Sequence, residues 1–121
     1  MKQFINAYIV CMLWSSNDES NDQGGDPLDE NYDQSDLSPE AMAIIKDDCE
    51  KFLDLAENTI DLDRFELGCL GHDFWLTRNH HGAGFWDGDY PEDVGKVLTE
   101  LSHKFGEINP IVGDDGKIYL E

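Results

Sequence analysis

Basic residues are scarce in this sequence. Its 121 residues include 8 lysines and arginines against 27 aspartates and glutamates, which gives a formal net charge of −19. Proteins hold nucleic-acid phosphates and anionic lipid surfaces through lysine and arginine, so this composition argues against direct binding to DNA, RNA or a membrane. We expect instead a partner protein with a basic surface, such as the DNA-binding face of another protein.

Cysteine is also scarce. Cys11, Cys49 and Cys69 are an odd number and show no C-x-x-C spacing, which argues against a disulfide framework. Buried, reduced thiols in a cytosolic chain are the simplest interpretation. The alternative is one disulfide pair with one free thiol.

Apolar runs are short. The run at residues 7–14 is too short to span a membrane. It is also a poor signal peptide, because Asn6 interrupts the apolar region and no cleavage site follows Trp14. We predict a buried first helix over residues 3–15, apolar nearly all round, with a strand as the alternative.

Familiar catalytic motifs are missing as well. The sequence contains no G-x-S-x-G, Walker A or dinucleotide-binding fingerprint. Carboxylate pairs are so numerous that a two-acid mechanism can be drawn almost anywhere, which removes its value as evidence. We therefore predict a protein that is not an enzyme, with no catalytic residues, no bound metal and no cofactor.

What the sequence has in excess is acid, and the excess is local. Residues 17–66 hold 17 acidic and 3 basic side chains, a net of −14. Residues 15–37 contain no basic residue and are rich in Ser, Asn, Asp and Gly, which predicts a long exposed acidic loop anchored by Leu28, Tyr32 and Leu37. The chain length favours a single domain over residues 1–121.

The clearest predicted element is a helix that starts after Ser38, with Pro39 at its first position. Apolar residues follow from Met42 to Ile60 at the spacing of a helix with one buried face. Acidic residues project from nearly the opposite side, with neighbours about 5–6 Å apart. We predict that this row binds the partner, although a merely solubilising surface is the alternative. The row consists of Glu40, Asp47, Glu50, Asp54, Glu57 and Asp61.

Residues 74–79 and 85–87 predict a β-hairpin around a glycine-rich turn at residues 80–84. Trp75 and Trp86 on this hairpin are candidates for a partner-facing aromatic patch, with core packing as the ordinary alternative.

The remaining elements complete an α+β fold. Pro91 opens a second amphipathic helix, which Gly106 ends. Residues 110–112 and 117–120 predict a further hairpin. We expect two or three helices packed on a small antiparallel sheet of three to four strands.

The densest cluster of metal-ligand types lies in the same region. The cluster consists of Cys69, His72, Asp73, His80, His81, Asp87 and Asp89. On a strand, however, His72 and Asp73 would face opposite sides. A small metal-dependent enzyme that uses His72, Asp73, His80 and His81 is therefore kept only as an alternative.

Several motifs resemble a family of small acidic bacteriophage proteins. The main motif runs from Gly71 to Asp87, and shorter ones lie at residues 12–16, 106–107 and 113–119. The family usually has glycine at the position of His80. The resemblance implies a phage protein in the cytoplasm of an infected bacterium, and it carries no catalytic residues over to this chain.

The acid content and the resemblance lead to one expected function. By analogy with other small, very acidic phage proteins, we expect a DNA mimic that binds and inhibits a host DNA-binding protein or enzyme. Defence nucleases, DNA glycosylases, gyrase and nucleoid proteins are the target classes that fit. The alternative is a phage accessory protein that binds its partner through the aromatic hairpin.

Overall fold

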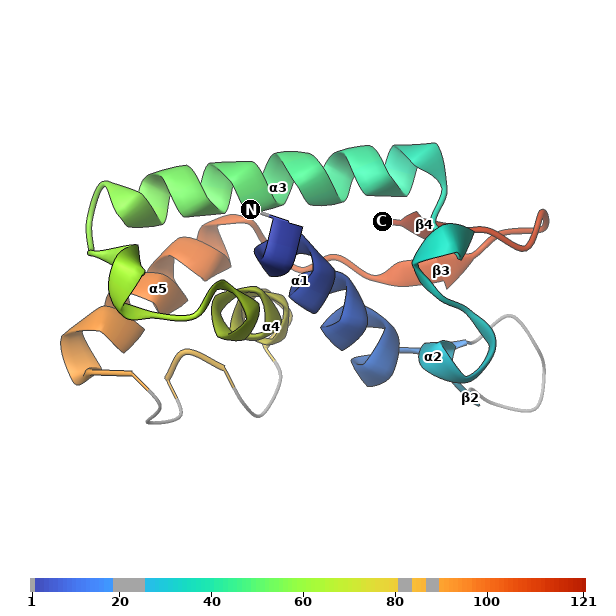
Figure 1. Ribbon diagram of the computed structural model, residues 1–121. Helices are drawn as coiled ribbons and strands as arrows, with labels where there is room; N and C mark the ends of the chain where they lie inside the picture. The colour runs from blue at the N-terminus through green and yellow to red at the C-terminus, as the bar shows by residue number, and fades with distance from the viewer. Residues whose placement is uncertain (1, 19–25, 81–83, 87–89) are drawn as a thin grey trace.

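Helices make up most of the structure. This computed structural model describes residues 2–18, 26–80, 84–86 and 90–121. In Figure 1 the long helix α3 lies across the top of the molecule, with the other main helices beneath it and α4 seen along its axis. The main helices are α1 (Lys2–Ser15), α3 (Pro39–Glu57), α4 (Leu67–Arg78) and α5 (Glu92–Lys104).

The most extensive contact between helices joins α1 and α4. Gly71 of α4 lies against the backbone of Phe4 in α1, and a Cβ atom at Gly71 would come within 2.2 Å of the Phe4 carbonyl oxygen. Glycine, which has no Cβ, permits this close approach. The rings of Tyr8 and Phe74 pack in the same contact, with centroids 5.5 Å apart.

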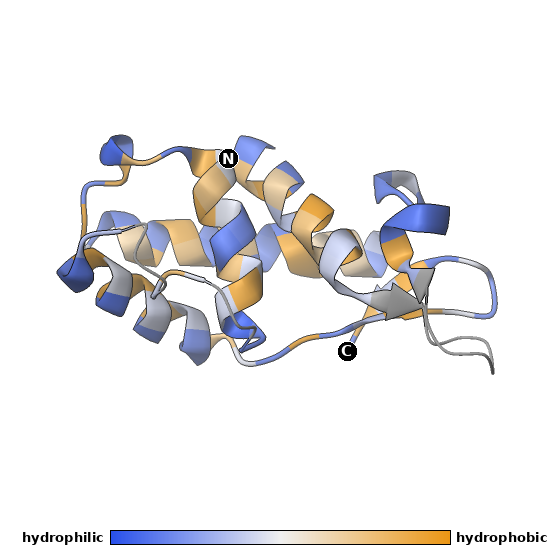
Figure 2. Ribbon diagram, turned by 90° about the horizontal axis from the view of Figure 1, so that it is seen from below, coloured by the Kyte–Doolittle hydropathy of each residue, from blue (hydrophilic) through white to orange (hydrophobic). Residues whose placement is uncertain are grey.

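An aromatic core lies where the main helices meet. The rings of Phe52 from α3 and Phe74 from α4 stack with centroids 4.2 Å apart. Phe85 stacks on Phe52 at 5.8 Å, and Phe105 packs edge-on against Phe74 at 5.2 Å. Figure 2 shows hydrophobic positions gathered where the helices face one another and hydrophilic positions along the outer side of α5. Burial of this apolar surface contributes more to the helices than their intrinsic propensity does.

The sequence predicted α3 correctly. The Ser38 hydroxyl accepts a hydrogen bond from the Ala41 N–H at 3.0 Å, and Pro39 occupies the first helical position. The helices predicted near the N-terminus and after Pro91 are also confirmed, as α1 and α5. The buried face of α3 consists of Ala41, Ile45, Cys49, Phe52, Leu53 and Ala56.

The β structure is smaller than predicted. β3 (Pro110–Val112) and β4 (Ile118–Leu120) pair antiparallel and confirm the second hairpin. β1 (Asn17–Asp18) and β2 (Asp26–Pro27) form a separate short ladder. Within the described ranges the fold is therefore mostly helical, with two-stranded ladders beside five helices, and the prediction of a sheet of three to four strands was wrong.

The first predicted hairpin was also wrong. Residues 74–78 belong to α4, and Phe85 and Trp86 lie in a turn. Aromatic residues favour strands, and the glycines at positions 68 and 71 concealed the helical pattern. Most of the predicted turn at residues 80–84 lies outside the described residues. Burial on α4 does not follow a single stripe, because five consecutive residues, Phe74 to Arg78, are all buried.

The described part of the predicted loop at residues 15–37 contains regular structure. It includes α2 (Leu28–Asn31) and the 3-10 helix η1 (Gln34–Asp36). All three predicted anchors are confirmed, because Leu28 and Leu37 are buried and Tyr32 packs against the core.

Candidate functional site

The outer side of α3 carries most of the predicted acidic row. These side chains are exposed and lie opposite the buried face of the helix, because residues three, four and seven apart share one side. Between Asp47 and Glu57 there is one carboxylate for about 5 Å of helix axis. We call this surface the acidic face, and it consists of Glu40, Asp47, Glu50, Asp54 and Glu57.

Asp61 does not continue the row. α3 ends at Glu57, with Asn58 as its C-cap. Asp61 lies beyond this end and caps the 3-10 helix η2 (Leu62–Arg64), where its Oδ1 accepts a hydrogen bond from the Asp63 N–H at 3.1 Å. Its side chain is exposed but belongs to a different element.

One cation pairs with the acidic face. Lys51 Nζ lies 2.9 Å from Asp47 Oδ2, one helical turn away, and both side chains are mostly exposed. The hydrogen bond that Lys51 donates to Asp47 raises the pKa of Lys51. Within the described ranges Glu50, Asp54 and Glu57 form no salt bridge. The C-terminal half of the acidic face therefore has no cation at ion-pair distance.

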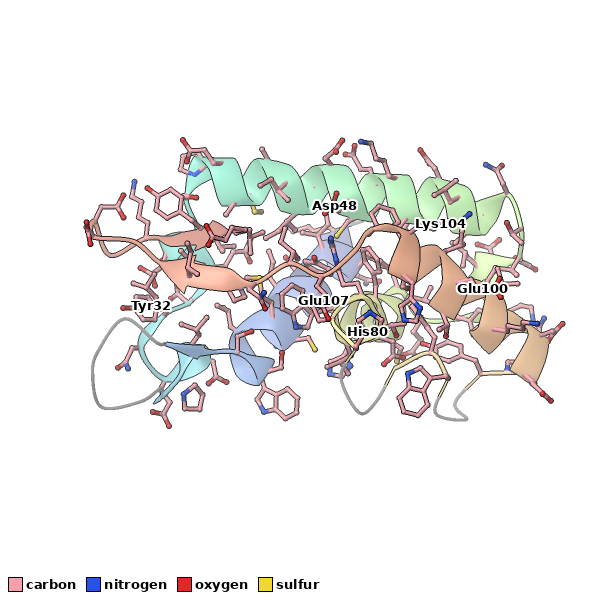
Figure 3. The ribbon with its side chains drawn as sticks, turned by 180° about the vertical axis from the view of Figure 1, so that it is seen from behind. Tyr32, Asp48, His80, Glu100, Lys104 and Glu107 are labelled. Atoms are coloured by element: carbon pink, nitrogen blue, oxygen red, sulfur yellow. The ribbon has the colours of Figure 1, made fainter. Side chains whose placement is uncertain are left out.

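Asp48 is the one acid of α3 that points into the molecule (Figure 3). Its Oδ2 lies 2.8 Å from Nη1 of Arg78, whose side chain is 3% exposed. Arg78 also donates to the Tyr8 hydroxyl oxygen at 3.1 Å, and to the carbonyl oxygens of Phe105 and Gly106 at 3.1 and 2.9 Å. These bonds tie α1, α3, α4 and the end of α5 together, so this buried cluster serves the fold.

Reasoning from the sequence missed the role of Arg78. Two features of the sequence point to a buried arginine at this position. Arg78 is the one lysine or arginine between Arg64 and Lys96, and on a helix it shares a side with the apolar Phe74. Burial raises the pKa of Tyr8 more than the neighbouring Arg78 guanidinium lowers it. Tyr8 therefore remains a neutral hydrogen-bond acceptor for Arg78.

The structure brings together part of the predicted metal cluster. His72 Nδ1 lies 3.5 Å from Asp73 Oδ1, which is long for a hydrogen bond, and the Tyr90 hydroxyl donates to Asp73 Oδ2 at 2.7 Å. His80 follows the end of α4, about two helical turns from His72, and His81 lies outside the described residues. Among the residues that the structure describes, no three His, Cys, Asp or Glu side chains form a group that could hold a metal ion.

His80 has an unusual backbone conformation. Its φ of 56° lies in the left-handed region that favours glycine, although histidine enters it more readily than most residues do. His80 follows Asn79, the C-cap of α4, where a left-handed residue commonly ends a helix. Its ring stacks on that of His103 in α5, with centroids 4.4 Å apart. A glycine would adopt this conformation without strain.

The two candidate tryptophans have different environments. Trp75 is 1% exposed and donates from Nε1 to Ser15 Oγ at 2.8 Å, so it belongs to the core. Trp86 is 55% exposed. The expectation that Trp75 faces a partner was therefore wrong, and an aromatic contact in this region would fall on Trp86.

All three cysteines are free. Cys11 and Cys49 are buried as predicted, whereas Cys69 is exposed on α4. Burial raises the pKa of the Cys11 thiol to about 12 and also raises that of Cys49. Because the thiolate is the reactive form, Cys69 is the one thiol that a solution reagent should reach in the folded protein.

In comparisons with known proteins, no family model, curated protein or solved structure matches the chain. No helix in the described ranges is both long and apolar enough to cross a membrane. The candidate site therefore rests on the chain's own residues, and the acidic face of α3 is its largest feature.

Proposed function

We propose that this chain is a phage-encoded DNA mimic that occupies the DNA site of a host protein in the bacterial cytoplasm. The observation that supports the proposal most is the acidic face, where exposed carboxylates follow one side of α3 over most of its length. Each strand of B-DNA presents one phosphate for about 3.4 Å of axis. Between Asp47 and Glu57 the acidic face presents one carboxylate for about 5 Å of helix axis, and with Glu40 included the mean spacing is about 6 Å, a comparable though lower density.

The arrangement of these acids goes against the stability of the helix. Like charges three or four residues apart destabilise a helix by a few tenths of a kcal/mol for each pair. A surface that served solubility alone would mix the two signs, as helices commonly do along their exposed faces. Among the described residues no cation lies at salt-bridge distance from Glu50, Asp54 or Glu57, and Lys51 pairs with Asp47 instead.

Apolar side chains beside the acidic face favour a protein partner. Ile44 is 36% exposed and Leu55 is 43% exposed, and each lies on α3 next to the carboxylates. Leu55 also lines a shallow hollow of about 440 Å³ with Asp54, Phe105 and two lysines, Lys51 and Lys104. These groups offer a basic protein surface apolar contacts that phosphates do not provide. Charge steering should make binding fast and sensitive to salt.

The experiment that names the target is a pull-down from bacterial lysate at low salt, with the tagged chain as bait. Elution in a salt gradient and mass spectrometry would identify the captured protein. We expect a DNA-binding protein that salt releases and that duplex DNA displaces. A captured partner that is indifferent to both salt and DNA would contradict the mimic.

Charge reversal tests whether the acidic face makes the contact. Lysine at Asp47, Glu50, Asp54 and Glu57 should abolish capture without unfolding the chain, because all four side chains are exposed. The matched control reverses four exposed acids elsewhere and so changes the net charge equally. Equal loss of binding in both variants would show that only total charge matters. The control positions are Asp63, Glu100, Glu107 and Asp114.

The exposure of Trp86 supports one alternative, a phage accessory protein that binds through this aromatic residue. Under that alternative Trp86→Ala would remove binding, whereas the four lysine substitutions would leave it. Under the DNA-mimic proposal the two results are reversed. Neither proposal assigns a catalytic role to the chain.

A further inference from the structure

A groove of about 680 Å³ lies between α1 and α4, away from the acidic face. Its lining includes Ala7 and Val10 from α1, and Cys69, His72 and Leu76 from α4. None of its lining residues comes from α3. The groove is therefore a surface separate from the one that carries the proposed function.

The α1 edge of this groove is unusually apolar for exposed surface. Val10 is 65% exposed and Trp14 is 61% exposed. They are four residues apart on α1, so they lie side by side on one face of the helix. The Trp14 ring lies 6.5 Å from the ring of His72, which lines the groove. Figure 2, which views the molecule from the side opposite α3, shows hydrophobic positions along α1. Contiguous exposed apolar surface of this kind commonly marks an interaction site.

The charge around the groove indicates what kind of partner fits. Glu66 and Asp73 lie in its lining, with Arg64 as the lining cation. The whole chain has a net charge of −19, so a second copy would bring equal negative charge against the same carboxylates. A partner that carries positive charge beside an apolar strip would be attracted by the negative charge of the chain and would bury its apolar strip against the edge of the groove.

We propose that the groove between α1 and α4 is a docking site for a cationic amphipathic helix of a partner protein. The lining side chains repeat at three- and four-residue intervals on two helices, which is the surface against which a third helix packs. Val10 would contact the apolar side of that helix, with the exposed Trp14 beside it on α1, and the exposed Glu66 would face its lysines or arginines. This inference does not depend on the DNA-mimic proposal, because the two surfaces share no residue.

Cys69 provides a reporter inside the groove without any mutation. It is exposed, whereas Cys11 and Cys49 are buried, so an alkylating reagent under reducing conditions should label one site in the folded protein. The probe is a synthetic Leu/Lys amphipathic peptide of about 18 residues, or about five helical turns. A scrambled peptide of the same composition controls for charge. We expect the amphipathic peptide to slow labelling of Cys69 about tenfold when its free concentration is ten times its Kd. No protection, or equal protection by the scrambled peptide, would overturn the proposal.

Variants at the groove edge separate docking from general charge attraction. Serine at both Val10 and Trp14 should weaken peptide binding at least about tenfold, the equivalent of one apolar anchor, and the fold should tolerate it because both side chains are exposed. The control is Trp86→Ser, at an exposed tryptophan outside the groove lining, which should leave binding unchanged. Unchanged binding in the Val10/Trp14 variant would overturn the proposal. So would a concentration-dependent dimer, seen by sedimentation, that protects Cys69 without peptide.

Discussion

α3 and α4 cover the same aromatic core, but they present very different surfaces. α3 leaves one side open to solvent, and that side carries five of its six acids. α4 packs against α1 and α5, and seven of its twelve residues are buried. Charge on the open side of α3 is compatible with many folds, whereas each buried polar group on α4 needs a hydrogen-bond partner inside the protein. The proposed function therefore rests on the exposed side of α3, whereas the contacts of α4 serve mainly the packing of the fold.

The ion pairs of the two helices show the same contrast. Lys51 and Asp47 pair on the outside of α3, and both side chains are mostly exposed. Arg78 of α4 pairs with Asp48 beneath α3, where the arginine side chain is 3% exposed. Water screens the charges of the first pair, and it solvates either side chain when the other is removed. Removal of one partner from the second pair leaves an uncompensated charge in the interior.

The largest expected effect is therefore that of Arg78→Ala. Loss of the guanidinium leaves Asp48 without its cation and frees the carbonyl oxygens of Phe105 and Gly106. We expect the free energy of unfolding to fall by about 3–5 kcal/mol, measured by urea denaturation. The control is Lys51→Ala on the other side of α3, which should change stability little. Similar losses in both variants would contradict the contrast between the helices.

The next effect separates two glycines of α4. Gly71→Ala would place a Cβ atom 2.2 Å from the Phe4 carbonyl oxygen, so α1 and α4 must move apart. We expect a loss of about 1–3 kcal/mol. Gly68 of the same helix has no atom within 4 Å of an added Cβ, so Gly68→Ala should stabilise the protein by up to about 1 kcal/mol. Thermal unfolding of both variants checks the prediction, and shifts of the same sign would refute it.

Alkaline pH should distinguish the buried thiols from Cys69. Burial raises the pKa of Cys11 from 9.0 to about 12, and it raises the pKa of Cys49 as well. The stability that each neutral, buried thiol contributes to the free energy of unfolding is fully present below pH 9 and is lost as the pH rises towards 12. The loss is at most about 1.4 kcal/mol per pH unit for each thiol. Urea denaturation at pH 7, 9 and 10.5 measures this loss.

The control for the alkaline experiment is a pair of alanine variants. Cys11→Ala should flatten the decline in stability above pH 9, because it removes one buried thiol. Cys69→Ala should leave the decline as it is, because Cys69 is exposed. A decline that depends equally on both residues would show that burial is not its cause.

The smallest expected effect is at the end of α4. His80 has a φ of 56°, a conformation that disfavours residues with a Cβ atom by about 1–2 kcal/mol. His80→Gly should be more stable than His80→Ala by about 1 kcal/mol, because the two variants differ mainly in this strain. Paired thermal unfolding curves test the order. An alanine variant as stable as the glycine variant would show that the left-handed conformation is not kept.

The sequence predicted α3 well and α4 poorly, for a physical reason. Because the exposed side of α3 is polar and its buried side is apolar, the hydropathy of successive residues shows the 3.6-residue period of a helix. α4 is buried over most of its circumference, and its polar members Thr77 and Arg78 lie inside. A helix buried in this way shows little contrast between its sides, and its aromatic run is typical of strands.

The candidate site shows the same limit. Local periodicity was enough to place Glu40, Asp47, Glu50, Asp54 and Glu57 on one exposed face. It did not separate Trp75 from Trp86, because the two residues differ in burial and belong to different elements, a helix and a turn. It also gave no sign of the groove, whose lining comes from α1, α4 and the residues between α3 and α4.

The sequence by itself determined the charge of this protein, the start of its long acidic helix at Pro39 and the side of that helix that meets water. These properties follow from composition and from neighbours a few residues apart. Only the tertiary structure decided that Gly71 is a contact point, that Arg78 is buried against Asp48 and that Val10 lines a groove. Those outcomes depend on residues far apart in the chain, such as Arg78 and Tyr8, which meet only when the helices pack.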